Sequence, residues 1–441
     1  MRATRTTGAA DRIAVVVEKL LGEPTPLRIR AWDGSEAGPR HHPTLIIRSR
    51  RAIRRLLWHP DEIGLGRAWV AGEIDADGDL EEALRRLEIV GRDLAERRRL
   101  APVERAEVYR AAVLLGAVGP APKPPPEEAD LSGDRHSKRR DREAISHHYD
   151  VGNDFYELVL GPSMVYSCAY WARPDDPGYT LEDAQRDKNE LICRKLGLRR
   201  GMRLLDVGCG WGGLVIHAAR EHGVHAVGIT LSQEQAEYAR EKVYDAGLSG
   251  QVEIRVQDWR ELGDEPFDAV ASVGMAEHLG RENWPEYARR LHELLLPGGR
   301  LVNHQIVRRP GPRRRGRTFI DAYVFPDGEL LPLADVVGAL EDAELEVRDV
   351  ENLREHYART LRRWVANLER AWERAVRLGG AGRARVWRLY MTGSAMSFDA
   401  GRIGISQVLA VRPHADGRSE FPLTRTSWAC VEDVASVRGA A

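Results

Sequence analysis

The sequence predicts an α/β fold in which a mostly parallel sheet is flanked by helices and preceded by a smaller N-terminal α+β domain. An apolar run at 204–207 leads into a glycine-rich turn, a helical pattern follows, and a second apolar run spans 225–230. This order of strand, turn, helix and strand is the βαβ unit that opens a nucleotide-binding sheet. A proline-rich and then highly charged segment at 118–142 cannot bury a core and is predicted to be a linker. We therefore expect an accessory domain at 1–117 and a catalytic domain at 143–441.

The accessory domain contains both kinds of secondary structure. Residues 13–21 have helical periodicity, and 27–32 and 44–47 have the pattern of short strands. A basic cluster lies beside an apolar run at 56–58, and consists of Arg48, Arg50, Arg51, Arg54 and Arg55. Two interpretations stay open for this cluster, namely contact with an anionic lipid surface and a solvated helix face.

Composition excludes several classes of protein. The 441 residues allow two or three domains, and a formal net charge of −1 indicates neither a nucleic acid nor an acidic partner. Four cysteines without C-x-x-C spacing argue against a metal site or a disulfide framework and fit a reducing compartment. No apolar run approaches the roughly 20 residues of a membrane span, and the first residues lack the apolar core of a signal peptide. We expect a cytoplasmic protein that meets the inner face of the membrane only peripherally.

The glycine-rich turn reads DVGCGWGG from Asp206. Glycines let the backbone approach a ligand closely, and a helix N-terminus offers unpaired N–H groups. The second strand ends in the residues from Thr230 to Gln235, where a dinucleotide site would have a ribose-binding acid. This arrangement resembles the S-adenosylmethionine (SAM) turn of Rossmann-like methyltransferases. A purely structural glycine turn is the alternative.

Ordered motifs along 145–410 carry a more specific resemblance. The string HYDVGNDFYELVLGPSMVYSCAYW precedes LDVGCGWGG and ITLSQEQ, and the later motifs are GMAEHLG, VNHQIV, FPDGELLP, EHYARTL and GRIGISQV. Together they resemble the cyclopropane-fatty-acyl-phospholipid synthase family and its relatives, the mycolic acid cyclopropane synthases. The resemblance implies transfer of the SAM methyl carbon to the cis double bond of an unsaturated phospholipid acyl chain, with closure of a cyclopropane ring. From its composition alone, the first of these strings is either a lid over the site or an irregular packing segment.

The resemblance also implies a bound bicarbonate that acts as the base. Its site carries over to Cys168, Glu277, His304, Ile306 and Tyr357. The histidine and tyrosine side chains donate hydrogen bonds to a small oxyanion, and the backbone N–H groups of Cys168 and Ile306 are expected to do the same. Glu277 would accept the proton of the bicarbonate ion. Taken singly, each of these residues has an ordinary packing role as its alternative.

The SAM site implied by the resemblance has four parts. The glycine turn forms the first, and the end of the second strand lies near the ribose. An aromatic side chain after the third strand stacks on adenine, with ordinary packing as the alternative, and two residues before the sheet touch the methionine end. In that order the residues are Asp206, Gly208 and Gly210; Thr230 and Gln235; Trp259; and Tyr166 and Ser167.

Three features modify this interpretation. Position 276 is Ala where the family pattern leads us to expect Phe, so the acyl channel differs there. The segment 308–317 is unusually basic, and it either holds lipid phosphate or is a solvated loop. A stripe at helical spacing predicts one helix that either lines an acyl channel or packs in the core; its members are Leu361, Trp364, Leu368, Trp372 and Val376.

The resemblance implies a membrane phospholipid as substrate, because the mycolic-type enzymes generally lack an N-terminal domain like the one predicted here. We also expect a homodimer formed through this domain. A close alternative is a C-methyltransferase of acyl chains that makes methylene- or methyl-branched fatty acids with a partner reductase. A small-molecule N- or O-methyltransferase would not need the base-site motifs. A non-catalytic lipid-binding protein with a vestigial SAM site is the alternative from another class.

Overall fold

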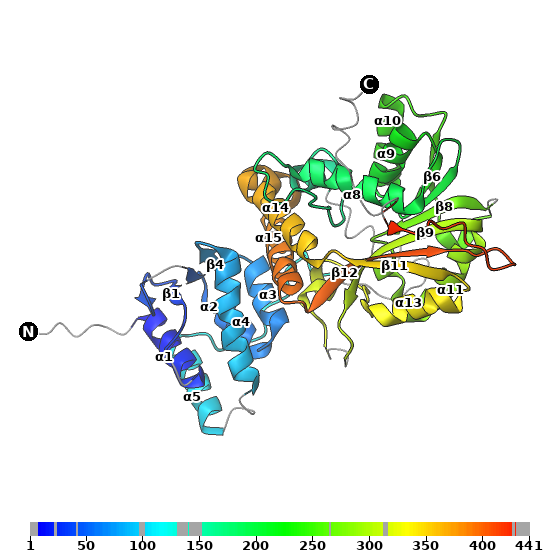
Figure 1. The fold of residues 1–441 in the computed structure, drawn as a ribbon. Helices are drawn as coiled ribbons and strands as arrows, with labels where there is room; N and C mark the ends of the chain where they lie inside the picture. The colour runs from blue at the N-terminus through cyan, green and yellow to red at the C-terminus, as the bar shows by residue number, and fades with distance from the viewer. Residues whose placement is uncertain are drawn as a thin grey trace, which may run out of the picture. The chain divides into compact units, whose positions relative to one another are not determined.

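The computed structural model describes residues 8–21, 24–40, 43–96, 102–129, 140, 152–263, 266–311, 316–425 and 428. Contacts divide these residues into two compact units (Figure 1). Unit 1 takes its residues from 1–130, 315–324 and 372–396, and unit 2 takes the others. The two returns of the polypeptide into unit 1 were not foreseen from the sequence. The boundaries at 117 and 142 stay predictions.

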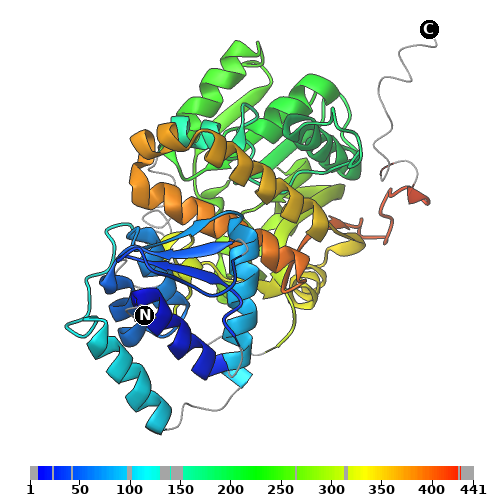
Figure 2. The same cartoon turned by 90° about the vertical axis from the view of Figure 1, so that its left-hand side faces the viewer.

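Unit 1 is an α+β unit built on a four-stranded sheet with the order β2-β1-β3-β4. Strand β1 is antiparallel to β2 and parallel to β3, and β3 is antiparallel to β4. Figure 2 shows this sheet in blue with helices beside it. The strands are β1 (Arg28–Ala31), β2 (Glu36–Ala37), β3 (Thr44–Ile47) and β4 (Ile74–Asp77). The helices are α1 (Ala9–Leu21), α2 (Arg50–Trp58), α3 (Glu62–Val70), α4 (Leu80–Glu96), α5 (Pro102–Leu114), α12 (Phe319–Tyr323) and most of α15 (Trp372–Asp399).

The arginine cluster lies on and beside α2 and is largely engaged inside unit 1. Arg55 is buried, and its guanidinium group donates to both carboxylate oxygens of Glu73 at 2.8 and 3.2 Å. Arg48 donates to Asp75 at 2.9 Å, and Arg54 donates to a backbone carbonyl at 3.0 Å. Arg55 therefore neither contacts a lipid surface nor lies on a solvated helix face, and both interpretations drawn from the sequence are wrong for this residue. It forms a buried ion pair because it lies on the inward face of α2, together with the buried Ala52.

Unit 2 contains the predicted α/β sheet. Its main order is β11-β12-β9-β8-β5-β6-β7, and β10 pairs with β9. The strands from β9 to β7 in this order are parallel, and β12 is antiparallel to both β9 and β11. The mixed, mostly parallel sheet confirms the predicted fold class. The strands are β5 (Arg203–Val207), β6 (His225–Thr230), β7 (Val252–Val256), β8 (Phe267–Val273), β9 (Leu295–Arg308), β10 (Leu331–Pro332), β11 (Glu346–Asn352) and β12 (Ile403–Val411).

Helices cover both faces of this sheet. One apolar core lies beneath α11 and α13, and the other lies beneath α8, α9 and α10 (Figure 1). The α-helices of unit 2 are α7 (Asn153–Leu160), α8 (Leu181–Leu196), α9 (Gly213–His222), α10 (Gln233–Asp245), α11 (Gly280–Glu293), α13 (Leu333–Asp342) and α14 (Arg354–Arg370). Two short 3-10 turns, η1 (Trp259–Glu261) and η2 (Ala276–His278), follow β7 and β8. Within the described residues, no helix has the length and apolar character needed to cross a membrane.

The aromatic stripe after Tyr357 does not continue along one helix. Leu361, Trp364 and Leu368 are buried on α14, which ends at Arg370. Ala371 has φ −109° and ψ 26°, and the backbone enters α15 and unit 1 after it. The prediction of a single helix through residue 376 is therefore wrong, because the backbone passes from one unit to the other at this point.

Candidate active site

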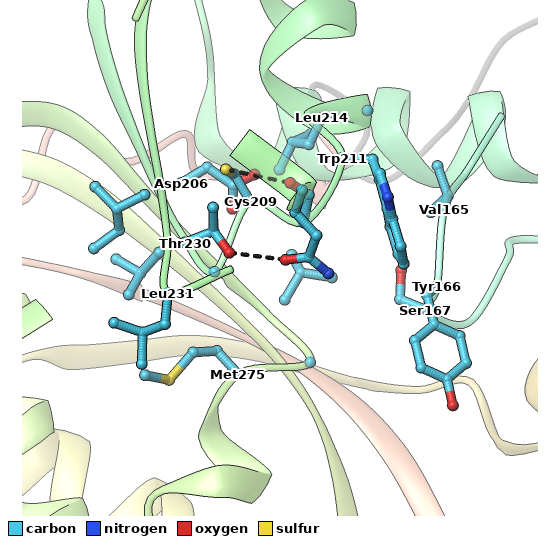
Figure 3. A pocket seen from close by; sticks show the side chains of 18 of the residues that line it. Val165, Tyr166, Ser167, Asp206, Cys209, Trp211, Leu214, Thr230, Leu231 and Met275 are labelled. Carbon is cyan, nitrogen blue, oxygen red and sulfur yellow. Dashed lines mark hydrogen bonds between the residues drawn. The ribbon is translucent and has the colours of Figure 1, made fainter. Parts of the chain in front are cut away.

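A pocket in unit 2 opens at the carboxyl ends of β5 and β6 (Figure 3). Ligands of open α/β sheets bind at this edge, outside the ends of the parallel strands. All of the predicted SAM contacts line the pocket, namely Tyr166, Ser167, Asp206, Gly208, Gly210, Thr230, Gln235 and Trp259. The structure thus brings together residues that are far apart in the sequence. Their individual roles in binding stay predictions.

The glycine turn folds back tightly against the next strand. The N–H groups of Gly208 and Cys209 both donate to the carbonyl of Ile229, at 3.0 and 2.9 Å. Gly208 has φ 84°, and a Cβ atom placed on it would lie 3.1 Å from the side chain of Met275. The positive φ therefore favours glycine, and the close approach leaves little room for a side chain. Because α9 begins at Gly213, which lines the pocket, its first N–H groups are close to the site.

Two buried ionisable side chains face the turn. Asp206 lies near the end of β5, and its Oδ1 finds no hydrogen-bond partner within the described part of the protein. Burial raises the pKa of Asp206 to about 7, and the ammonium group of Lys188 opposes that rise. Lys188 lies on α8 and also lines the pocket, and burial lowers its pKa to about 8. Lys188 was not among the predicted site residues, because the helical pattern of residues 181–196 does not distinguish an inward lysine from a solvated one.

The two walls of the pocket come from different parts of unit 2 (Figure 3). On one wall, the hydroxyl of Thr230 donates to Oε1 of Gln235 at 2.8 Å, so each side chain orients the other. On the opposite wall, Tyr166 contacts the ring of Trp364 with a centroid distance of 5.4 Å. Trp211, which the sequence analysis did not single out, donates from its indole N–H to the side chain of Asn153 at 2.8 Å. The segment 164–167 lines the pocket, whereas His147 to Val151 lie outside the described residues.

Glu277 belongs to the predicted base site and lies on η2. Its Oε1 accepts the N–H of Ile306 at 2.7 Å, which differs from the expectation that this N–H faces the anion directly. The N–H of Gly274 donates to the carbonyl of His304 at 2.8 Å, so the loop carrying Glu277 is tied to β9 at two points. Burial raises the pKa of Glu277 to about 7, although the bond from Ile306 opposes that rise. Repulsion between this carboxyl group and an anion is therefore reduced near neutral pH.

His304 is fully buried on β9. Its Nδ1 lies 3.1 Å from Nε2 of Gln407. Burial and two nearby ammonium groups, those of Lys188 and Lys195, lower the pKa of His304 well below its usual value, so the imidazole is neutral. Across the described residues, neither His304 Nε2 nor Glu277 Oε2 has a hydrogen-bond partner. Because buried polar atoms are rarely left unpaired, each of these two atoms is a candidate contact for a ligand.

The other three predicted base-site residues are joined to one another through Leu353. The carbonyl of Leu353 accepts the N–H of Tyr357 at 3.1 Å and lies 3.7 Å from the thiol of Cys168. Its N–H donates to the carbonyl of Ile405 at 2.8 Å, and Ile405 pairs with Ile306 across β12 and β9. The structure therefore connects Cys168 and Tyr357 to the strand that carries Ile306.

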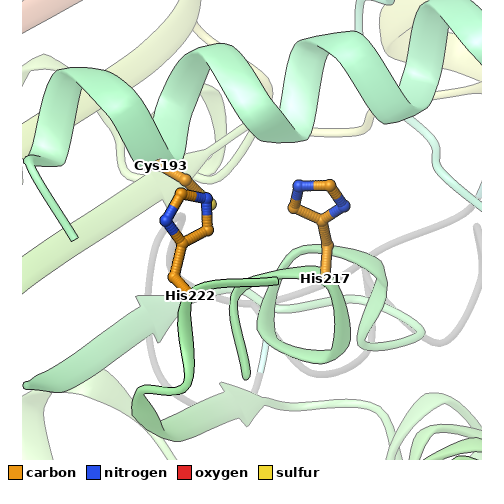
Figure 4. A group of neighbouring side chains, drawn as sticks. All are labelled: Cys193, His217 and His222. Atoms are coloured by element: carbon orange, nitrogen blue, oxygen red, sulfur yellow. The ribbon is translucent and has the colours of Figure 1, made fainter. Parts of the chain in front are cut away.

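A second group of titratable side chains lies between α8 and α9 (Figure 4). Potential ligand atoms of Cys193, His217 and His222 lie within 4.8 Å of one another. The Nε2 atoms of both histidines face Oε2 of Glu190, at 3.2 and 3.0 Å, and Arg194 pairs with the other oxygen at 2.8 Å. Although burial opposes it, the bonds from His217 and His222 hold the pKa of Glu190 well below its usual value. One carboxylate thus satisfies both imidazoles, and we interpret the group as a structural network.

Comparison with known proteins agrees with this geometry. The family model described as mycolic acid cyclopropane synthetase matches residues 136–408. A probable fatty acid methyltransferase of Pseudomonas putida is 42% identical over 408 residues, which are 91% of this chain and 95% of the relative. The cyclopropane-fatty-acyl-phospholipid synthase of Escherichia coli K12 is 36% identical over 284 residues, 64% of this chain and 71% of the relative.

A solved structure shows the same catalytic fold with a cofactor product bound. The mycolic acid cyclopropane synthase CmaA1, complexed with S-adenosylhomocysteine (SAH) and CTAB, is 33% identical and superposes with a TM-score of 0.57. The match covers 61% of this chain and 97% of that structure. The fold, the pocket and these similarities define a SAM-dependent methyltransferase. The protein belongs to the mycolic acid cyclopropane synthetase family.

Proposed function

We propose that the protein converts the cis double bond of an unsaturated phospholipid acyl chain into a cyclopropane ring, with SAM as methyl donor and bicarbonate as base. The observation that carries this proposal is the pair of buried atoms, Glu277 Oε2 and His304 Nε2, which have no partner among the described residues. The neutral imidazole of His304 can donate one hydrogen bond. The carboxyl group of Glu277, with a pKa of about 7, can exchange a proton near neutral pH. Both features fit a small planar oxyanion.

The reaction places strict demands on the site. SAM supplies an electrophilic methyl group, and bicarbonate supplies the base. One alkene carbon bonds to the methyl carbon and releases SAH, which leaves the other alkene carbon cationic. Loss of a proton from the new methyl group to the base then provides the electron pair that closes the ring.

The described residues meet these demands by burial. Cys168 and His304 are fully buried, and Tyr357 is almost so. A dry site protects the cation from attack by water, and a fixed site aligns the weakly nucleophilic alkene with the methyl group. The bond between Ile306 N–H and Glu277 Oε1 leaves the second carboxyl oxygen available to the anion.

The substrate and location belong to the same proposal. The name of the Escherichia coli relative specifies an acyl phospholipid, and this supports a phospholipid substrate here. The protein would then act at the cytoplasmic face of the membrane, attached peripherally. The basic segment 308–317 was predicted either to hold lipid phosphate or to be a solvated loop, and its residues 312–315 lie outside the described residues. Arg317, at the end of this segment, donates to the carboxylate of Glu128 at 2.9 Å within unit 1. Assembly as a homodimer stays a prediction.

A second candidate is a C-methyltransferase of acyl chains, whose methylene product is reduced by a partner enzyme to a methyl branch. The Pseudomonas putida relative, which matches over 91% of this chain, is named a probable fatty acid methyltransferase. Ala276, next to Glu277, is also a departure from the expected family pattern. The same carbocation gives this methylene product when it loses a different proton.

Product chemistry tests the proposal. Purified protein is incubated with SAM, bicarbonate and vesicles of a cis-monounsaturated phospholipid, and the acyl esters are analysed by mass and retention before and after catalytic hydrogenation. We expect an ester heavier by one CH₂ that resists hydrogenation. Uptake of hydrogen by the heavier ester would establish the second candidate instead. Methylation of a free or carrier-bound acyl group, with none on vesicles, would contradict the phospholipid assignment.

A further inference from the structure

We propose that Gln407 and Lys195 are positioning residues that hold His304 in the tautomer with hydrogen on Nε2, so that this N–H donates to the anion of the base site. The inference deepens the proposed function and rests on it for the identity of the anion.

Strand pairing places Gln407 beside His304. The two residues are directly opposite each other in the antiparallel pair of β12 and β9. Side chains of directly opposite residues point to the same face of a sheet and are in contact range. Nε2 of Gln407 lies 3.1 Å from Nδ1 of His304, and both residues are fully buried. Water therefore cannot replace this contact without opening the core.

Lys195 determines which way the amide of Gln407 points. The Nζ atom of this buried lysine, at the end of α8, lies 2.7 Å from Oε1 of Gln407 and 2.5 Å from Oε2 of Glu351. Burial lowers the pKa of Lys195, but the Glu351 carboxylate opposes that shift and favours the ammonium form. An ammonium group has only donors, so the amide atom that faces it must be the oxygen.

The hydrogen on His304 then follows by elimination. With its oxygen toward Lys195, the amide presents its NH₂ group to His304, and this group can only donate. Nδ1 of His304 must therefore accept, which leaves a neutral imidazole with its hydrogen on Nε2. Burial and the ammonium groups of Lys188 and Lys195 keep His304 neutral by lowering its pKa.

The direction of these linked hydrogen bonds determines what the site can bind. In the tautomer described, the unpartnered Nε2 atom is a donor and favours an anion. In the opposite tautomer, Nε2 would present a lone pair to the anion and repel it. Glu351, Lys195 and Gln407 thus act on the base site through His304, and none of them lines the SAM pocket.

Nitrogen NMR measures the tautomer directly. The protein is labelled with ¹⁵N only in its 14 histidines, and long-range ¹H–¹⁵N correlation shows which ring nitrogen carries hydrogen. The signals of His304 are identified by their loss in His304→Gln. In the wild-type protein we expect hydrogen on Nε2 and an unprotonated Nδ1 that accepts the hydrogen bond from Gln407. Hydrogen on Nδ1 would overturn the inference.

The main variant is Gln407→Glu, which keeps the size of the side chain and a partner for Lys195. A carboxylate accepts from both neighbours, so we expect hydrogen to appear on Nδ1 of His304. In Gln407→Leu and Lys195→Met, the tautomer is no longer held, and the bicarbonate concentration for half-maximal activity should rise about tenfold, the usual effect of losing a hydrogen bond to a charged group. The KM for SAM should stay unchanged.

Two lysine variants serve as controls. Lys195→Arg preserves a donor to Gln407 and should preserve the tautomer, and Lys242→Met removes an exposed lysine of α10 and should change nothing. The inference fails if Gln407→Glu and Gln407→Leu keep both the wild-type tautomer and the wild-type bicarbonate response. A changed tautomer together with activity that never responds to bicarbonate, in wild type or variant, would support the tautomer control and contradict the proposed base.

Discussion

Replacing Glu277 by glutamine is expected to make the stability of the protein less sensitive to alkaline pH and to abolish its product. Burial raises the pKa of Glu277 from 4.5 to about 7. Because the folded-state pKa is the higher one, protonation favours the folded state, and stability falls as the pH rises from 4.5 towards 7. Each pKa unit corresponds to about 1.4 kcal/mol, so the ionised side chain costs about 3 kcal/mol at pH 8 and less than about 1 kcal/mol at pH 5.

Glutamine removes this ionisation but retains an oxygen that accepts the N–H of Ile306. The difference in unfolding free energy between Glu277→Gln and wild type should therefore change by about 2.5 kcal/mol between pH 5 and pH 8, whatever fixed cost the amide adds. Urea unfolding at a series of pH values measures it, with fluorescence and circular dichroism compared to check that each transition is two-state. Glu286→Gln, on the exposed side of α11, is the matched control. A difference that does not vary with pH would refute the reasoning.

Three further predictions concern other parts of the molecule. Gly208→Ala forces a non-glycine residue to φ 84° beside Met275 and should weaken SAM binding at least about tenfold in calorimetry, so unchanged affinity would contradict the proposed turn. Arg55→Met leaves the buried carboxylate of Glu73 with only the exposed Arg51 as an ion-pair partner, at 3.3 Å, and should destabilise unit 1 by about 2 kcal/mol in urea unfolding. A loss below about 0.5 kcal/mol would contradict a stabilising role of the buried pair. Glu190→Gln should cost about 2 kcal/mol near pH 6. The cost should shrink progressively as the pH falls from 4.5 through the lowered folded-state pKa of Glu190, because protonation of the folded carboxylate removes the stabilisation. A cost that is the same at pH 6 and at pH 2 would argue against this account.

Local patterns predicted the fold well, and the residues predicted to contact SAM line one pocket. The glycine turn, the βαβ unit and the polar end of β6 are each contained in a short stretch, so their residue types specify their geometry. The contacts at Thr230 and Gln235 follow for the same reason, because these residues are five apart and α10 begins between them.

The remaining features depend on packing between distant segments. Lys188, Lys195 and Gln407 have ordinary helical or strand patterns, and only the tertiary structure shows that they are buried near the site. Arg55 was expected at a surface because periodicity does not reveal which arginine of a basic helix points inward. The end of α14 at Arg370 was missed because no proline or glycine stands there to signal it.

The most direct test of the account is the dependence of methyl transfer on bicarbonate. Initial rates of SAH formation on cis-monounsaturated phospholipid vesicles are measured in buffer freed of carbon dioxide, with bicarbonate added back in steps. The account predicts a rate that rises with bicarbonate and saturates in the wild-type protein, and no such response in Glu277→Gln. A full wild-type rate without bicarbonate, unchanged on its addition, would contradict the claim that Glu277 and His304 hold this anion as the base.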